Sequence, residues 1–233
     1  MIAPDWAQPW FAPYREVATP VLARLAAGEQ VAAALGHERF EPDGPRSGGY
    51  EQHVAATGRV PTRDNAHDLF NGLVWLRCPG FKAALNRAHM AAPPATPGRR
   101  GPLRDALTLL DESGLLLSAP APLRQALRAQ DWAALFVGHR ELWRSAQALI
   151  VGHALLEKLL APRKALCARA LLVDDVNAPV LPAALAPADL PPLPVLGIPG
   201  WWPANASRGF YADAQVFRAK RLASAPSMGG LAC

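Results

Sequence analysis

The chain has 233 residues, of which 51% are hydrophobic and 18% are charged, and its formal net charge is +5. This composition excludes a disordered or fibrous protein, and the length suits one domain with a sizeable buried core. The basic residues are scattered in short groups without a nucleic-acid-binding signature, so we expect no nucleic-acid partner.

Cysteine usage and hydropathy indicate the compartment. The three cysteines are far apart and form no CxxC pair, which favours a reducing compartment over a disulfide framework. No stretch of about 18 apolar residues occurs, and the N-terminus lacks the basic and apolar regions of a signal peptide. We therefore expect a cytoplasmic protein with no membrane partner.

The first part of the chain is predicted to be mainly helical. Residues 20–35 have the apolar spacing of an amphipathic helix, and residues 40–49 read as a loop. Residues 50–62 indicate a hairpin whose second arm contains a proline and therefore lies at a sheet edge. Two helices follow, over residues 66–77 and 81–90, and the proline between them kinks the pair.

The second part mixes strands and helices. Residues 106–119 are two apolar arms around a polar centre, which predicts a buried hairpin. Residues 122–160 have helical spacing with one break at Gln130 and Asp131. Residues 166–173 predict a last strand, and the Pro-rich chain beyond Asn177 predicts extended coil over the surface of the core.

These elements predict an α+β fold in which residues 1–233 form a mainly helical single domain. It should contain a small antiparallel sheet, and the Pro-rich C-terminal coil should close one side. Residues 91–102 are so rich in Pro and Gly that we expect an exposed loop there, within the same domain.

The stretch RDNAHDLFNGLVWL, residues 63–76, places an ionisable pair at the head of a predicted helix. With Asn65 as the N-cap, Asp68 falls at the third helical position, which resembles a capping box. His67, Asn71 and Trp75 share one face through i, i+4, i+8 spacing. Capping alone is sufficient to explain Asp68, which is also a candidate ligand or base, and a chemical site and a structural role are both open for His67 and Asn71.

Lys82, Asn86 and His89 recur at spacings of four and three on the next predicted helix. A cation, an amide and an imidazole therefore line one side of it. A solvated face is the favoured interpretation, and a substrate-binding side that includes Lys82 is the alternative.

The segment LLDESG, residues 109–114, places Asp111 and Glu112 in a tight connection between apolar arms. Asp at the first position and Gly at the fourth are typical of a type I turn, which is the favoured interpretation. A third partner close in space would make these carboxylates part of a site.

The run LIVGHALLEKLLAP, residues 149–162, is the most informative for chemistry. In a continuous helix His153 lies mid-stripe on the buried face, with Glu157 one turn on. Burying both groups is costly unless they satisfy each other or a third group. Either a His153 to Glu157 hydrogen bond orders the core, or Glu157 fixes the tautomer of a metal-binding or catalytic His153.

The segment GIPGWWPAN, residues 197–205, predicts a loop on one fixed path that carries two adjacent indoles. Trp201 and Trp202 must point in different directions, so one can plug the core while the other borders a cleft. A core cap is the favoured role of a tryptophan here.

Four segments together resemble DUF3025, a bacterial family of proteins of unknown function: HDLFNGLVWL, LTLLDESG, GHALLEKLL and LPVLGIPGWWPANASRGFYADAQVFR. The resemblance covers residues 50–218 and implies no activity. It implies that His67, Asp68, Asn71, Asp111, Glu112, His153, Glu157 and the loop from Trp201 to Asn205 belong to one design. A looser likeness connects the His67 segment with His-Me finger nucleases, although those place the catalytic histidine at the end of a strand.

The leading hypothesis is an intracellular hydrolase whose polar cluster binds a divalent metal or performs acid and base catalysis. His67 and His153 are then metal ligands or proton carriers. Asp68 and Asp111 are ligands or bases, and Glu157 orients His153. We expect the two histidine side chains within about 10 Å of each other, with Asp68 or Asp111 nearby, in one pocket bordered by a tryptophan.

The remaining candidate residues would bind an unidentified small molecule; these substrate-binding candidates are Asn71, Lys82, Trp201, Trp202 and Asn205. The alternative hypothesis is a non-catalytic module whose Trp201 and Trp202 loop binds a protein partner. Clustering distinguishes the two, because an enzyme needs its histidines and carboxylates convergent in a cleft.

Overall fold

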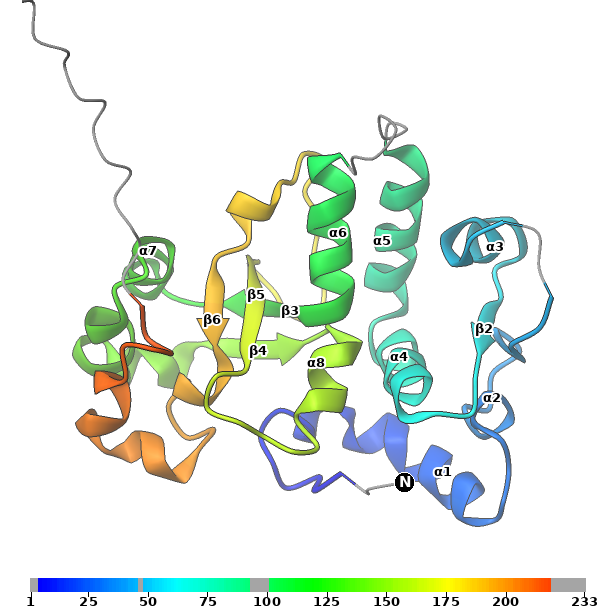
Figure 1. The fold of residues 1–233 in the computed structure, drawn as a ribbon, viewed down its shortest axis with the longest axis horizontal. Coiled ribbons are helices and arrows are strands. Elements are labelled where there is room, and N and C mark those ends of the chain that lie inside the picture. Colours follow the sequence, from blue (N-terminus) through cyan, green and yellow to red (C-terminus); the bar gives the residue numbers. More distant parts are fainter. Residues whose placement is uncertain (1–3, 46–47, 93–100, 219–233) are drawn as a thin grey trace, which may run out of the picture.

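The computed structural model describes residues 4–45, 48–92 and 101–218, which form an α+β fold (Figure 1). Helices predominate, and the predicted fold class is confirmed. Within the described residues, no helix has both the length and the apolar character needed to cross a membrane. The predicted exposed loop at residues 91–102 lies mostly outside the described residues, so it stays a prediction.

The N-terminal region differs from the single helix expected over residues 20–35. It contains two helices, α1 (Arg15–Ala26) and α2 (Val31–Ala34). Gly28 separates them with a φ of +91°, a left-handed conformation that a glycine adopts without strain. The amphipathic spacing was correct, but a turn interrupts it.

The hairpin expected over residues 50–62 is wrong. Tyr50–Thr57 is a helix, α3, and Val60–Thr62 is a strand, β2. Strand β2 pairs in parallel with β1 (Phe40–Pro42), inside the predicted loop. The helix ends at Gly58, whose positive φ of 69° is the usual left-handed stop. Gly58 therefore ends a helix and does not form the turn of a hairpin.

The kinked helix pair is confirmed. Helix α4 spans Ala66–Arg77 as predicted, and α5 spans Pro79–Ala91. Pro79 begins α5 instead of only preceding it, because a proline lacks the N–H that the first turn of a helix does not use.

The second predicted hairpin is also wrong, because residues 106–119 are a helix followed by a strand. Helix α6 spans Pro102–Ser113 and strand β3 spans Gly114–Ser118. Ala106, Leu107 and Leu110 are fully buried at helical spacing. Asp111 and Glu112 therefore lie in the last turn of α6 and not in a type I turn.

The helix expected over residues 122–160 is confirmed up to its break, and beyond it the chain forms shorter helices interrupted by a strand. Helix α7 spans Ala121–Ala129 and ends at Gln130, which has a φ of 54°. A short π-helix (Ala134–Gly138) and a 3-10 helix (Arg140–Ser145) follow, then strand β4 (Gln147–Ile150) and helix α8 (His153–Lys158). The apolar residues of this run do not mark one face of a helix. Leu149 and Ile150 are apolar because they belong to a buried strand.

The main sheet has the strand order β4-β3-β5-β6, where β5 is Cys167–Leu172 and β6 is Pro192–Pro194. Strand β5 confirms the strand predicted near the C-terminus. Because β3 and β5 are parallel, the sheet is mixed and not purely antiparallel. The Pro-rich coil does more than cover the surface, since it supplies β6 and buries Leu193.

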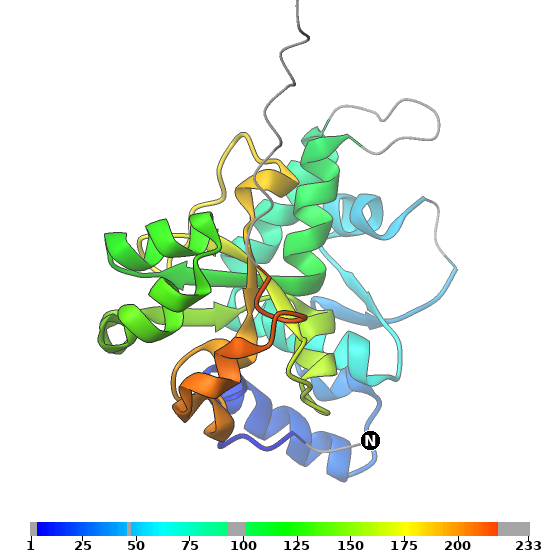
Figure 2. The same cartoon turned by 60° about the vertical axis from the view of Figure 1, so that its left-hand side comes forward.

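Helices α4, α5, α6 and α8 pack together beside this sheet, as Figures 1 and 2 show. The end of α6 meets the start of α8 because the backbone carbonyl of Gly114 accepts hydrogen bonds from the N–H groups of Val151 and Gly152, both at 2.9 Å. A Cβ at Gly152 would lie 2.4 Å from the Gly114 nitrogen, so only glycine permits this approach. The contact places His153 beside Asp111 and Glu112.

Candidate functional site

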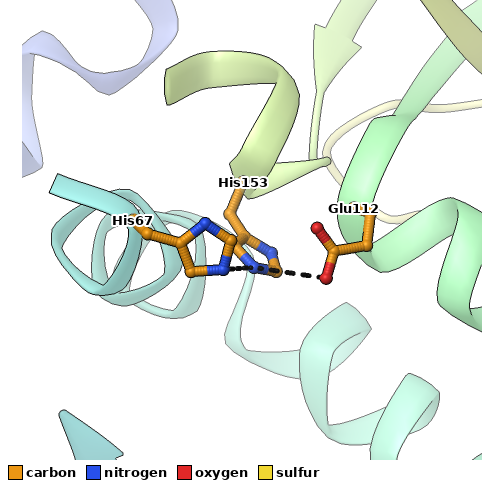
Figure 3. Close-up of side chains that lie close together, drawn as sticks. All are labelled: His67, Glu112 and His153. Carbon is orange, nitrogen blue, oxygen red and sulfur yellow. Dashed lines mark hydrogen bonds and ion pairs between the residues drawn. The ribbon is translucent and has the colours of Figure 1, made fainter. Parts of the chain in front are cut away.

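Two histidines from different helices meet in the space between α4, α6 and α8. His67 lies in the first turn of α4, and His153 is the first residue of α8. Their Nε2 atoms are 2.9 Å apart, and the ring planes are inclined at 75° (Figure 3). The predicted proximity within about 10 Å is therefore confirmed. The predicted mid-helix position of His153 is wrong, because the helix begins at this residue.

Glu112 from the last turn of α6 completes a three-residue group. Its Oε1 atom lies 3.9 Å from Nε2 of His153, and Figure 3 shows the carboxylate directed toward the two rings. One ligand atom each from His67, Glu112 and His153 fall within 4.8 Å of one another. Two imidazole nitrogens and a carboxylate oxygen are a common donor set for a divalent transition metal.

Glu157 orients the other side of the His67 ring. Its Oε2 atom is 2.9 Å from Nδ1 of His67. The predicted pairing of Glu157 with His153 is therefore wrong. Both residues lie on α8, but Nε2 of His153 and the Glu157 carboxylate each reach across to His67 on α4.

Asp111 faces the corresponding side of His153. Its Oδ2 atom is 3.7 Å from Nδ1 of His153, which is within ion-pair distance but longer than a hydrogen bond. Its Oδ1 atom accepts a hydrogen bond from Nζ of Lys82. Because Lys82 is only 3% exposed, the solvated face predicted for this part of α5 is wrong. Asn86, on the same face, is also buried.

The charges of this buried group are mutually dependent. Burial raises the pKa of Asp111, but Lys82 and His153 outweigh burial and bring it below its usual value. Burial lowers the pKa of Lys82, but Asp111 outweighs it and the pKa lies above its usual value. Asp111 raises the pKa of His153, but burial outweighs it and lowers the pKa below its usual value. The neutral imidazole is therefore favoured.

The two carboxylates select the same tautomer of both rings. Glu157 beside Nδ1 of His67 and Asp111 beside Nδ1 of His153 both favour a proton on Nδ1. The two Nε2 lone pairs then face each other at 2.9 Å. Facing lone pairs repel unless a proton or a cation lies between them, so the arrangement is suited to bind a positive species.

The histidines lie in the wall of a cavity of about 530 Å³. All but one of its lining residues are polar or charged: Asp43, Tyr50, Glu51, Pro61, Arg63, His67, Asp68, Asn71, His89, Arg104, Thr108, Asp111, Glu112 and His153. The predicted bordering tryptophan is wrong, since neither Trp201 nor Trp202 belongs to this wall.

Asp68 lines the cavity but is engaged with Arg63. Its Oδ2 atom accepts from the backbone N–H of Arg63 at 2.6 Å, and Oδ1 accepts from the guanidinium at 2.9 Å. The predicted N-cap is confirmed, because Oδ1 of Asn65 accepts from the Asp68 N–H at 2.8 Å. These contacts turn the Asp68 carboxylate toward Arg63. The structure therefore does not group Asp68 with His67 and His153 as a metal ligand.

Asn71, one turn beyond His67, also lines the cavity. Its Nδ2 atom donates to the hydroxyl of Tyr50 at 3.0 Å. Its Oδ1 atom is buried without a hydrogen-bond partner among the described residues. A polar wall is thus continuous from the histidines to Tyr50 on α3.

The loop of Trp201, Trp202 and Asn205 lies elsewhere in the fold. Asn205 is 1% exposed, and its Nδ2 atom donates to the backbone carbonyls of Leu196 at 2.9 Å and Ile198 at 2.7 Å. The Trp201 ring lies 6.2 Å from that of Trp10, centroid to centroid. The structure does not place these three residues with the histidines.

Glu112 is the residue that sequence reasoning missed as a ligand candidate. The signal was present, because Leu107 and Leu110 at a spacing of three indicate a helix that continues to Asp111 and Glu112. The polar DESG ending, considered alone, favours a turn instead. Recognition of the helix would have placed both carboxylates at its C-terminal end.

Comparison with known proteins gives one match. The DUF3025 family, described as proteins of unknown function, matches residues 40–221. Neither the curated proteins nor the solved structures contain a significant match to the chain.

Proposed function

Because the chain belongs to DUF3025, whose description assigns no activity, we propose from the site geometry that it is a metal-dependent hydrolase. His67, His153 and Glu112 would hold one divalent metal ion. The observation that carries this proposal is the convergence of two Nε2 atoms, each on a ring whose Nδ1 faces a carboxylate. Histidines that bind metals characteristically have such carboxylate partners.

The distances fit a metal centre after a small adjustment. Metal to imidazole bonds of about 2.0–2.1 Å at a tetrahedral angle place two neighbouring nitrogens roughly 3.3 Å apart. The Nε2 atoms, now 2.9 Å apart, must therefore separate slightly. The Glu112 carboxylate must approach, since it lies 3.9 Å from His153. Glu112 is about half exposed, so its side chain has room to do so.

Three protein ligands leave a coordination position for water. A divalent metal held by these three residues would activate that water for hydrolysis. The cavity beside the histidines admits a substrate to that position. Since all but one of the residues in its wall are polar or charged, we propose a small polar substrate over a lipid or an acyl chain.

A second candidate is acid and base catalysis by the histidine pair without a metal. The 2.9 Å separation of the Nε2 atoms is also a normal hydrogen-bond distance, so one proton can bridge the rings. The two candidates differ in their response to chelators, because only the first loses function when metal is removed.

Metal analysis of the purified protein tests the proposal. We expect about one equivalent of a bound divalent metal after incubation with Zn²⁺ and desalting. His67→Ala, His153→Ala and Glu112→Gln should each lower this content strongly. The matched control is His53→Ala, because His53 also pairs with a carboxylate, Oε1 of Glu41 at 2.7 Å, but is not in the cluster.

The same analysis identifies the metal and connects it with activity. Iron in place of zinc would point to oxygen chemistry, since two histidines and one carboxylate also hold Fe²⁺. Hydrolysis of a panel of chromogenic esters, phosphoesters and amides should be lost with EDTA and restored by metal. Wild-type protein that retains no more metal than His153→Ala contradicts the proposal.

A further inference from the structure

Lys82 is a buried cation that lies behind the site. It is 3% exposed, and it does not line the cavity, so it does not contact a substrate there. Its Nζ atom donates to Asp111 and lies 5.6 Å from the centroid of the Trp75 ring. Burying an ammonium and a carboxylate together is often no more stabilising than an apolar pair of the same volume. Stability alone is therefore a weak explanation for this lysine.

Asp111 connects Lys82 with His153 across three helices. Lys82 is on α5, Asp111 on α6 and His153 on α8. One carboxylate oxygen of Asp111 bonds to Lys82, and the other lies 3.7 Å from Nδ1 of His153. That Nδ1 atom is buried and makes no hydrogen bond to any described residue. Nε2 of the same ring contacts His67, so Asp111 supplies the carboxylate that faces the opposite side of the ring.

The two histidines differ in this support. Glu157 is 39% exposed and contacts Nδ1 of His67 directly at 2.9 Å. Asp111 is only 17% exposed and makes no direct hydrogen bond to His153. A carboxylate in a nearly closed space needs a fixed partner to keep one orientation. Lys82 supplies that partner.

We propose that Lys82 is a positioning residue for the metal site: it fixes Asp111 so that this carboxylate faces Nδ1 of His153. Nε2 of His153 is then left for the metal, beside Nε2 of His67 and the carboxylate of Glu112. This inference rests on the proposed function, because it assumes that the three residues bind a metal. It assigns the role of Lys82 to orientation and not to packing.

Two variants separate orientation from packing. Lys82→Met retains an unbranched side chain over Trp75 but leaves the Asp111 carboxylate unpaired. The double variant Lys82→Met/Asp111→Leu removes both charges and should fold at least as stably as the single variant. Lys158→Met is the matched control, since Lys158 is an exposed lysine on α8, five residues from His153.

The experiment measures Zn²⁺ affinity by competition with a chromophoric chelator and the tautomer of His153 by ¹⁵N NMR of the metal-free protein. We expect both Lys82 variants to bind Zn²⁺ about 10–100-fold more weakly, as when a partner of a metal-binding histidine is lost. His153 should also lose its preference for a proton on Nδ1. Lys158→Met should match the wild type in both measurements.

Lys82→Met tests Lys82 itself. If that variant does not fold, the double variant still tests whether the Lys82 and Asp111 pair as a unit positions His153. Wild-type Zn²⁺ affinity and an unchanged His153 tautomer in the double variant overturn the proposal, because packing then suffices. If the wild type itself binds no Zn²⁺, the proposed function fails. In that event the tautomer comparison still decides whether Lys82 positions His153 through Asp111.

Discussion

Two groups of buried polar residues in this protein are satisfied in different ways. Asn205 donates to the carbonyls of Leu196 and Ile198, which belong to the same stretch of chain. Lys82, Asp111 and His153 instead come from three helices, and Nδ1 of His153 has no hydrogen-bond partner among the described residues. A polar group satisfied by the nearby backbone fixes a local shape. A polar cluster with spare capacity, in a cavity wall, is suited to bind a ligand.

The comparison also bears on the alternative hypothesis of a protein-interaction module. Trp201 and Trp202 are partly buried and pack against the hydrophobic core. Trp201 lies against Trp10, and Asn205 fixes the path of the loop that carries both indoles. The binding of a protein partner through this loop stays a prediction. The histidines and carboxylates converge, which is the arrangement that an enzyme requires.

The largest effect on stability should come from Asn205→Leu. This change keeps the side-chain volume but leaves two buried carbonyls without their donor, so we expect a loss of about 3 kcal/mol in the free energy of unfolding. Zn²⁺ affinity of the folded protein should stay at the wild-type value. Chemical denaturation and metal competition measure the two quantities.

Asn177→Ala is the control for this change, because Asn177 is exposed and accepts one hydrogen bond from Arg77. It should change the free energy of unfolding by only a few tenths of a kcal/mol. Weaker Zn²⁺ binding in folded Asn205→Leu would break the comparison, since the loop would then support the metal site.

The sequence was sufficient to predict the helix that carries His67. Asn65 as N-cap and the following apolar spacing predicted α4 with its observed bounds, because local capping and periodicity determine a helix of this kind. It was also sufficient to predict that His67 and His153 meet. That inference used only the cost of burying two imidazoles, and not their exact place in a helix.

The partners of the histidines were not predictable from the sequence in the same way. Glu157 was assigned to His153 because the two are four residues apart, yet it bonds to His67, ninety positions away. Helical spacing predicts that Lys82 lies at the surface. Its burial depends on how α5 packs against α6. Such contacts follow from tertiary packing, which local periodicity does not encode.

Glu157→Gln tests the partly exposed side of the site, where Glu157 contacts His67. The amide keeps an acceptor for Nδ1 of His67 but loses the charge, so Zn²⁺ affinity should fall about 10-fold. The free energy of unfolding should change by less than about 1 kcal/mol, because the pair is partly solvated. Competition with a chelator and thermal unfolding provide the two measurements.

Glu141→Gln is the control, since Glu141 is 74% exposed and pairs with Arg144 in the same chain segment. It should leave Zn²⁺ affinity unchanged. If Glu157→Gln also binds Zn²⁺ like the wild type, Glu157 does not orient a metal ligand, and the tautomer argument for His67 fails.

The smallest effect should come from Asp68→Asn, which tests whether location or bonding partner decides the role of a polar residue. Asp68 lines the cavity like the histidines, but its carboxylate is engaged by Arg63 through both the backbone and the guanidinium. We expect unchanged Zn²⁺ affinity and a loss of no more than about 1 kcal/mol in the free energy of unfolding at pH 7. The amide can still accept from the backbone N–H of Arg63, and the Arg63 side chain is 57% exposed.

That loss should depend on pH in one direction. Burial raises the pKa of Asp68, but the contacts with Arg63 outweigh burial and hold the folded-state pKa below the usual value of 3.8. A carboxyl whose folded pKa is depressed contributes its stability above the unfolded pKa and loses it as pH falls through the folded pKa. The difference between wild type and Asp68→Asn should therefore be constant from pH 7 to about pH 5 and shrink below about pH 4. Glu16→Gln, at an exposed acid on α1, serves as the control in the same denaturation series. Loss of Zn²⁺ binding in Asp68→Asn at unchanged stability would show that Asp68 belongs with the histidines despite its bonds to Arg63.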